Sequence, residues 1–405
     1  VRGFSPFFMK LSRQVAKIEH TKLMNMTIGI EAQRLFRLKK HGMDMVVLEL
    51  IKELQKIDHE NQYYIYVAPG EDHCIEETSN FKIRVIGGNF YPFWEQKTLP
   101  KAAKRDHCDI LHCTSNTAPL TTSIPLVVTL HDIIFMEKSP LSILTGNGSN
   151  YQKMGNLYRR WNVPKVVKKC SKLITVSKSE KVRLCEYFNL GHDKVEAVYN
   201  GVSTHFIPVT DQIKLNEFRA RYSLPDRFFL HLGNTDPKKN TAGVLKALSD
   251  YKKRTGDNVD LVMLDFDKEE LSRIINEIGD ETLLKSIYLT GYVKNQELPA
   301  LYSLAEQFLY PSLRESFGIP ILEAMACGVP VITGNTSSMP EISGDAALLV
   351  DPFNSDEIID AIIKIKEDNT LRAEMIEKGF KQAEKFSWKA MAHQVYEIYR
   401  HFEKG

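Results

Sequence analysis

Residues 310–333 read Tyr310-Pro-Ser-Leu-Arg-Glu-Ser-Phe-Gly-Ile-Pro-Ile-Leu-Glu-Ala-Met-Ala-Cys-Gly-Val-Pro-Val-Ile-Thr333, and this stretch decides the fold. The short apolar run Phe308–Tyr310 stops at a proline, which predicts a strand that ends there. Pro320 suits the first turn of a helix, because the N–H that proline lacks would have no partner at that position. The spacing therefore predicts a helix that begins at about Ile319.

The second half of the stretch predicts another strand. Gly328 is expected to end the helix, since glycine tolerates the left-handed conformation that closes many helices. Val329–Thr333 is short and apolar, as a buried strand is. A strand, a helix and a second strand in this order form the unit of a parallel sheet.

The same alternation recurs along the chain and predicts a doubly wound α/β fold. Helical periodicity follows several of the apolar runs, for example at residues 43–57, 268–278 and 355–366, and Ser387 is expected to cap a last helix. The other strands are expected at Thr27–Glu31, Tyr63–Ala68, Lys82–Ile86, Ile110–Cys113, Leu126–Leu130, Leu173–Val176, Val195–Tyr199, Phe228–Gly233 and Val259–Leu264.

The loop Glu315–Gly318 lies where the ligand of a parallel sheet is expected, beyond the carboxyl end of a strand and at the start of a helix. An anion, most plausibly a phosphate, fits such a place because of the unpaired N–H groups. Glu315 and Glu323 are eight residues apart and can face one ligand from different heights, gripping the hydroxyls of a sugar or ribose. The alternative is that both are solvated surface charges, the usual state of glutamate.

A second positive element precedes the helix that carries Val244 and Leu248. Asn240 is expected to cap that helix, which places Lys238 and Lys239 at its positive end, facing the loop of Glu315. Two positive elements would then converge on one anion.

The chain resembles the retaining family 4 glycosyltransferases of GT-B fold, whose donor motif is a glutamate, seven residues and a second glutamate. The resemblance runs from Glu315 through Glu323 to Asn335-Thr-Ser-Ser-Met-Pro-Glu341 and Gly344-Asp-Ala-Ala347, and continues more loosely from about Thr27 to the C-terminus. It implies two Rossmann-like domains that face each other across a cleft. It also implies transfer of a hexosyl group, with mannosyl a guess, from a nucleotide diphosphate sugar to a hydroxyl of a glycan or lipid-linked acceptor, with retention. Assembly of a surface polysaccharide is the expected role.

The resemblance also sets the expected domains. Residues 26–200 would form the acceptor-binding domain and residues 201–386 the nucleotide-sugar-binding domain. Residues 387–405 would be a helix that packs back on the N-terminal domain. Residues 1–25 are basic and irregular, and are expected to be an extension outside the fold.

Roles for single residues follow from the resemblance. Lys239 would bind the donor diphosphate, Glu315 the sugar hydroxyls and Glu323 the ribose; Lys239, Glu315 and His131 are the expected catalytic residues. Some relatives also carry an arginine where this chain has Asn234. The remaining donor contacts are expected from Gly233, Asn234, Tyr292, Val293, Ser316, Phe317, Gly318 and Ile319, and the acceptor contacts from Gly42, His131 and Asp132.

A metal and other cofactors are not expected. Asp265-Phe-Asp267 looks like the Asp-x-Asp metal motif of another transferase fold, but its place between a strand and a helix predicts capping. His107-Cys108 and His112-Cys113 could suggest a metal cluster, but Asp109–Thr114 reads as a strand, which would put adjacent ligands on opposite faces. The net charge of +2 does not predict a nucleic-acid partner.

Residues 138–179 carry many lysines and arginines, with aromatic residues between them and without one Asp or Glu. Such a surface can contact an anionic membrane, here expected through residues 153–178, or can simply be a solvated helix face. No apolar run is long enough to span a membrane and no secretory signal is evident, so a cytoplasmic location, at the inner face of a membrane, is expected.

Three other functions remain open. A GT-B framework also serves nucleotide-sugar epimerases or hydrolases, which need no acceptor. A hydride-transferring Rossmann enzyme is disfavoured because the first strand is not followed by G-x-G-x-x-G. A non-catalytic sugar-nucleotide binding protein is the third.

Overall fold

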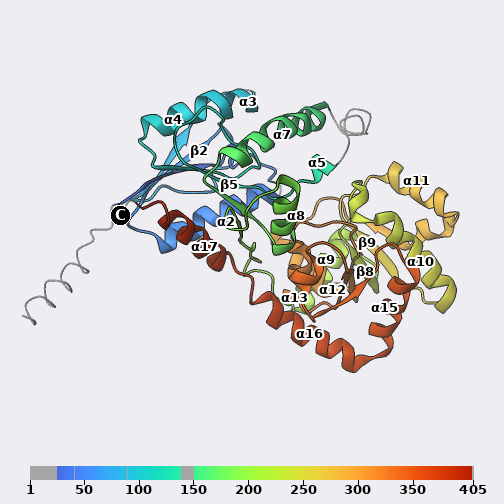
Figure 1. The fold of residues 1–405 in the computed structure, drawn as a ribbon. Helices are drawn as coiled ribbons and strands as arrows, with labels where there is room; N and C mark the ends of the chain where they lie inside the picture. The colour runs from blue at the N-terminus through green and yellow to red at the C-terminus, as the bar shows by residue number, and fades with distance from the viewer. Residues whose placement is uncertain (1–24, 41, 89, 138–149, 404–405) are drawn as a thin grey trace, which may run out of the picture. The chain divides into compact units, whose positions relative to one another are not determined.

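The computed structural model describes residues 25–40, 42–88, 90–137 and 150–403 of the chain (Figure 1). Most of the predicted extension 1–25, and the first part of the basic stretch 138–179, lie outside the described residues. Contacts divide the chain into two compact units. The described residues of the first unit lie within 25–129, 150–172 and 392–403, and those of the second are 130–137 and 173–391.

The described residues form two sheets, as the alternation of strands and helices predicts. The first has the strand order β3-β2-β1-β4-β5-β6-β7 and the second the order β10-β9-β8-β11-β12-β13. The strands of the second sheet pair in parallel throughout, and β1 pairs in parallel with β2 and β4 in the first. The strands are β1 (Thr27–Glu31), β2 (Gln62–Val67), β3 (Phe81–Val85), β4 (Ile110–Cys113), β5 (Leu126–Thr129), β6 (Lys172–Thr175), β7 (Val195–Ala197), β8 (Phe228–His231), β9 (Asp260–Met263), β10 (Ile287–Leu289), β11 (Gln307–Tyr310), β12 (Val331–Gly334) and β13 (Ala347–Val350).

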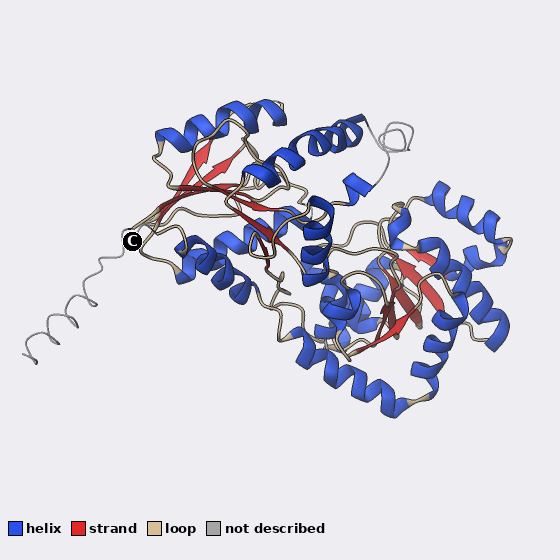
Figure 2. Ribbon diagram, in the orientation of Figure 1, coloured by secondary structure: helices blue, strands red, loops and turns tan. Residues whose placement is uncertain are grey.

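Helices alternate with the strands, which confirms the predicted doubly wound α/β fold (Figure 2). Within the described ranges, every helix is too short or too polar to span a lipid bilayer. The α-helices are α2 (Gly42–Ile57), α3 (Tyr91–Phe93), α4 (Leu99–Arg105), α5 (Ile134–Glu137), α7 (Asn150–Lys169), α8 (Lys178–Phe188), α9 (Gln212–Tyr222), α10 (Thr241–Thr255), α11 (Lys268–Ile278), α12 (Leu298–Leu304), α13 (Ile319–Ala326), α14 (Met339–Ser343), α15 (Ser355–Glu367), α16 (Asn369–Ala383) and α17 (Trp388–Arg400). Shorter or wider turns are η1 (Trp94–Thr98, a π-helix), η2 (Pro237–Lys239), η3 (Glu281–Ser286) and η4 (Asn295–Glu297).

The strand–helix–strand unit at residues 307–334 matches the prediction with one difference. Helix α13 begins at Ile319, as expected. Strand β12 begins at Val331 rather than at Val329. The reason is local: the N–H of Val329 bonds to the carbonyl of Ala324, 3.0 Å away, and so closes the helix instead of joining the sheet.

The core of the second unit is built on both faces of its sheet. Successive strand residues point to opposite faces, so Phe228 and Leu230 of β8 pack in one apolar cluster and Phe229 packs in another. Helices α12 and α13 contribute to the first cluster, and α10, α11 and α15 to the second. Burial on both faces explains why the strands of this sheet read as continuous apolar runs.

The last helix, α17, begins as predicted. The hydroxyl of Ser387 accepts a hydrogen bond from the N–H of Ala390, 3.1 Å away. In the first unit the Tyr399 hydroxyl lies 2.6 Å from Nδ1 of His112 on β4, and both side chains are fully buried. This contact fixes the end of α17 to that sheet.

We expect Tyr399→Phe to lower the free energy of unfolding by about 1–3 kcal/mol, because it removes a fully buried hydrogen bond. Tyr396→Phe, which removes a hydroxyl from the more exposed side of the same helix, is the control and should change stability little. Urea denaturation of the three proteins measures both effects. Equal stability of wild type and Tyr399→Phe would contradict the structural role of this contact.

Candidate active site

Lys239 and Glu315 form a contact at the carboxyl edge of the second sheet. Lys239 ends the turn η2 after β8, and Glu315 follows β11, the strand next to β8. The Nζ of Lys239 lies 2.6 Å from Oε1 of Glu315 and 2.5 Å from the hydroxyl of Tyr310. The two charged side chains are only 16% and 10% exposed. The structure thus brings together the two loops in which an anion site is predicted.

Hydrogen bonds hold the backbone of Glu315 from both sides. Its N–H donates to the hydroxyl of Ser337 at 3.0 Å, and its carbonyl accepts from the hydroxyl of Ser338 at 3.0 Å. The Ser338 hydroxyl also lies 2.9 Å from the carbonyl of Phe317. The loop 335–338 therefore fixes the direction in which the Glu315 carboxylate leaves the chain.

Gly318 permits the turn between this loop and α13. It precedes the helix with φ +102°, a conformation that side chains rarely adopt. A Cβ at this position would also come within 3.1 Å of the side chain of Ile321. A residue other than glycine would strain the start of α13.

Glu323 lies in α13 with its carboxyl group largely buried. Its Oε2 accepts a hydrogen bond from the hydroxyl of Tyr302 at 2.9 Å. Burial raises the pKa of Glu323 to about 7, and the Tyr302 bond only partly opposes this shift. Near neutral pH the group therefore exists in both protonation states.

The predicted capping role of Asn240 is wrong. Asn240 does occupy the position before α10, but its backbone is left-handed, with φ +56°, and its side chain makes no capping bond. Instead, its Nδ2 donates to the carbonyls of Pro311, at 3.0 Å, and Pro352, at 2.6 Å. Asn240 therefore ties the start of the Glu315 loop to the loop after β13.

The other predicted donor residues differ in what they offer. At Gly233 a Cβ would meet Thr241 and His231 at about 2.5 Å or less, so only glycine fits. Tyr292 is 70% exposed, whereas Val293 packs in the core and leaves only its backbone for a ligand. Among the other predicted contacts, Oδ1 of Asn234 accepts a hydrogen bond from the N–H of Asp236. The carbonyl of Ser316 accepts one from the hydroxyl of Ser177. Phe317 and Ile319 flank Gly318 in the chain.

The predicted acceptor residues fall in different units. His131 and Asp132 follow β5 and group with the second unit, whereas Gly42 begins α2 in the first. His131 is buried, and Oδ1 of Asp132 accepts a hydrogen bond from the N–H of Ile134, the first residue of α5.

Asp267 caps α11, as predicted. Its carboxylate accepts a hydrogen bond from the N–H of Glu270 at 2.8 Å. Asp265 has a left-handed backbone and donates its N–H to the carbonyl of Gly291. Across the described ranges, no three His, Cys, Asp or Glu side chains gather in a way that could hold a metal ion.

Sequence reasoning missed a buried carboxylate in the first unit. Glu95, on the π-helical turn η1, accepts hydrogen bonds from the hydroxyls of Tyr91, Thr117 and Tyr158 and from the side chain of Gln96. Burial raises its pKa to about 7. The cluster joins α3, α7 and the loop after β4. Tyr91 is local to Glu95, but Thr117 and Tyr158 lie 22 and 63 residues away, so no local pattern could have indicated the whole cluster.

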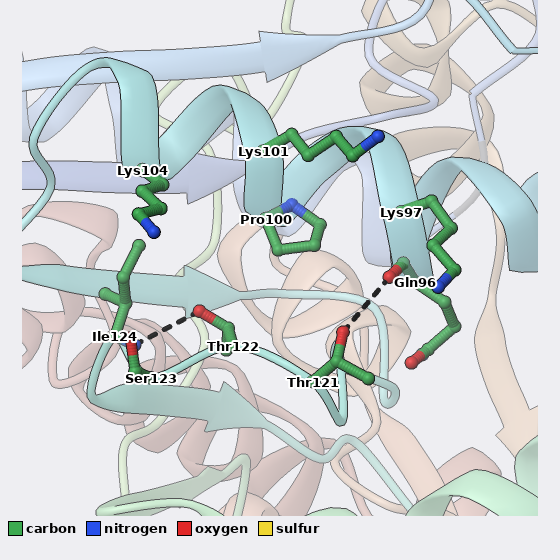
Figure 3. A pocket seen from close by; sticks show the side chains of 9 residues that line it. All are labelled: Gln96, Lys97, Pro100, Lys101, Lys104, Thr121, Thr122, Ser123 and Ile124. Atoms are coloured by element: carbon green, nitrogen blue, oxygen red, sulfur yellow. Dashed lines mark hydrogen bonds between the residues drawn. The ribbon is translucent and has the colours of Figure 1, made fainter.

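A shallow hollow of about 250 Å³ lies elsewhere in the first unit (Figure 3). Three lysines of η1 and α4 line one side, and the segment 121–124 before β5 lines the other. None of the predicted site residues lines it. Its lysines are Lys97, Lys101 and Lys104.

Both halves of the chain match known glycosyltransferase families. Residues 41–206 match the family described as Glycosyltransferase Family 4, and residues 214–382 match Glycosyl transferases group 1. The O-antigen chain mannosyltransferase B of Escherichia coli is 32% identical over 228 residues, which is 56% of this chain and 60% of that protein. The O-antigen chain mannosyltransferase RfbU of Salmonella typhimurium is 28% identical over 305 residues, 75% of this chain and 77% of that protein. The chain thus spans less than two thirds of the first relative's length.

Solved structures resemble nearly the whole chain. HepE of Anabaena, in complex with UDP and glucose, superposes with a TM-score of 0.70 at 17% identity and covers 93% of this chain and 100% of that one. WaaG, a glycosyltransferase involved in lipopolysaccharide biosynthesis, superposes with a TM-score of 0.68 at 13% identity and covers 92% and 99%. At these identities the likeness shows the fold alone, which is GT-B, as predicted. Fold and family matches agree: the chain belongs to the family 4 glycosyltransferases.

Proposed function

We propose that the chain transfers a hexosyl group from a nucleotide diphosphate sugar to a hydroxyl of a glycan or lipid-linked acceptor. The observation that carries this proposal is the Lys239–Glu315 contact, 2.6 Å long, beside the glycine turn that opens α13. A cation and a carboxylate at one sheet edge can bind the two parts of such a donor, its diphosphate and its sugar. The cation can take the diphosphate, and the carboxylate can take the sugar hydroxyls.

In the reaction, the acceptor oxygen bonds to the anomeric carbon while the bond from that carbon to the phosphate oxygen breaks. The bonding electrons leave with the diphosphate, whose negative charge increases. The Lys239 ammonium and the N-terminus of α13 stabilise that charge. The acceptor proton passes to the departing phosphate oxygen, so no protein nucleophile takes part. Attack on the face that the leaving group occupied retains the configuration.

The proposal includes no metal, because Lys239 and the helix N-terminus supply the positive charge at the diphosphate. Glu323, four residues into α13, would bind the ribose hydroxyls, and Tyr292 would lie beside the base. His131, Asp132 and Gly42 would contact the acceptor.

Mannose is the first sugar to test, because two of the relatives are named as O-antigen mannosyltransferases. The names of these relatives do not give the base of the donor, and the HepE structure holds UDP, so donors with different bases are tested. Purified protein is incubated with GDP-mannose, UDP-glucose and related donors, with and without extracted lipid-linked acceptors. Nucleotide release that depends on the acceptor supports the transferase. Release without acceptor would indicate an epimerase or hydrolase, and binding without turnover a binding protein.

Contact with an anionic membrane is part of the proposal, with the enzyme working at the inner face. Residues 153–178 contain no acidic residue, and α7 holds most of this segment. Trp161 is 49% exposed, and the Nζ of Lys165 lies 3.9 Å from the centre of its ring. An exposed indole beside lysines suits the boundary between headgroups and acyl chains.

We expect Glu323→Ala to weaken nucleotide binding by about tenfold or more, because the ribose hydroxyls lose a carboxylate partner. Glu315→Ala should instead slow transfer by about two orders of magnitude and change nucleotide affinity less. Calorimetric titration of the nucleotide and a transfer assay separate the two. Unchanged affinity and full transfer in both variants would refute the assignment.

The buried carboxyl of Glu323 should make the stability of the protein depend on pH. Its pKa of about 7 in the fold lies above the ordinary value of 4.5, so the folded protein binds the extra proton between these pH values. Stability from this group is therefore full below about pH 4.5 and is lost as the pH rises toward 7, by about 3 kcal/mol.

Glu323→Gln carries no titrating proton, so its free energy of unfolding should fall less than that of wild type between pH 5 and pH 8. Glu374→Gln, at an exposed position on α16, is the control and should follow wild type. Urea denaturation at the two pH values gives the slopes. Parallel slopes for wild type and Glu323→Gln would contradict the raised pKa.

We expect Lys165→Gln to reduce binding to phosphatidylglycerol vesicles by about fivefold, the effect of one cation near an anionic surface. Trp161→Ala should also weaken binding, and the Lys165 effect should shrink at high salt. Lys268→Gln, at an exposed position in the first turn of α11 in the second unit, is the control. Vesicle sedimentation measures binding, and equal binding of all variants would exclude this surface as the membrane contact.

A further inference from the structure

Arg314 precedes Glu315 and forms a buried ion pair with a distant part of the chain. Its Nη2 lies 2.5 and 2.6 Å from the two carboxylate oxygens of Glu180 on α8. The Glu180 side chain is 0% exposed and that of Arg314 is 13% exposed. Burial raises the pKa of Glu180, and the guanidinium of Arg314 opposes that shift. The Glu180 carboxylate, if it were buried without this cation, would lower the stability of the fold. The ion pair therefore holds Arg314 firmly against α8.

The same guanidinium touches two functional segments. Its Nη1 donates to the carbonyl of Glu315 at 3.2 Å, beside the carboxylate that pairs with Lys239. Its Nη2 lies 3.7 Å from Oε1 of Glu137, at the end of the segment that begins with His131. One planar cation thus contacts both the Glu315 loop and the segment 131–137.

Independent contacts attach the start of α8 to the Glu315 loop and to α14. The hydroxyl of Ser177 donates to the carbonyl of Ser316 at 2.7 Å. The N–H groups of Lys178 and Ser179 donate to the carboxylate of Glu341, at 2.8 and 3.0 Å. The start of α8 is therefore a fixed support, and Arg314, bound to it through Glu180, can hold the Glu315 loop in one position.

We propose that Arg314 is a positioning residue for glycosyl transfer, which aligns the Glu315 loop with the segment 131–137 through Glu180 and Glu137. The kinetic part of this inference rests on the proposed function. Arg314 touches the backbone of Glu315 but not the residues proposed for the ribose and base. Its loss should therefore change the rate of transfer far more than nucleotide affinity.

The experiment compares Arg314→Gln and Arg314→Lys with Arg183→Gln. Arg183 is the matched control. It is an exposed arginine of α8 whose Nε lies 2.5 Å from Glu137, and within the described residues it forms no hydrogen bond or ion pair with Glu180 or Glu315. We expect Arg314→Gln to lower kcat by about tenfold to a hundredfold, because the reacting groups lose their alignment, with nucleotide Kd within about threefold. Arg314→Lys should recover part of the rate, and Arg183→Gln should resemble wild type.

Hydrogen exchange gives a second readout that does not depend on catalysis. In Arg314→Gln the amides of 313–318 and of 131–137 should both exchange faster, and in Arg183→Gln the 313–318 amides should not. If both segments exchange faster in Arg314→Gln but the wild type transfers no sugar, Arg314 still positions the two segments, and the proposed function is rejected. Unchanged exchange in 313–318, unchanged kcat, or equal losses in kcat and nucleotide affinity would overturn the inference. Glu180→Gln, which keeps the size of the side chain, repeats the test if Arg314→Gln fails to fold.

Discussion

The site depends on a charge pair that is held mostly out of water. Lys239 and Glu315 lie 2.6 Å apart and are each less than a fifth exposed, so each needs the other and further hydrogen bonds to offset the cost of desolvation. Tyr310 supplies such a bond to the ammonium, from the end of the strand that leads to Glu315. The pair requires β8 and β11 to be neighbours, which only the order of the whole second sheet provides.

Buried glutamates of this chain differ in what neutralises them. Glu315 faces a lysine and Glu180 an arginine, whereas Glu323 and Glu95 face only hydroxyl and amide donors among the described residues. Burial raises the pKa of the last two to about 7. The two glutamates that lack a neighbouring cation are thus the ones whose pKa burial brings close to neutral pH.

Sequence reasoning succeeded where the signal is local. Pro320 and Gly328 marked the limits of α13, and Ser387 and Asp267 were placed correctly as caps, because each depends on residues within one helical turn. It failed at Asn240, whose left-handed backbone and two carbonyl partners are set by loops 71 and 112 residues away. The pairing of Arg314 with Glu180 spans 134 residues, and the bonds of Glu95 to Thr117 and Tyr158 span 22 and 63, so no local pattern indicates them.

The resting charge pair also bears on which ligands the proposed site can select. A diphosphate that displaces Glu315 from Lys239 frees the carboxylate, which then needs new donors to offset its burial. The hydroxyls of the hexosyl group supply those donors, whereas a nucleoside diphosphate lacks that group and has only ribose hydroxyls, which the proposal assigns to Glu323. In the proposed function, the Lys239–Glu315 pair therefore favours a ligand that carries both an anion and a polyol. The same exchange requires Glu315 to stay in place when Lys239 leaves it, and the bonds of its backbone to Ser337, Ser338 and Arg314 are what can keep it there.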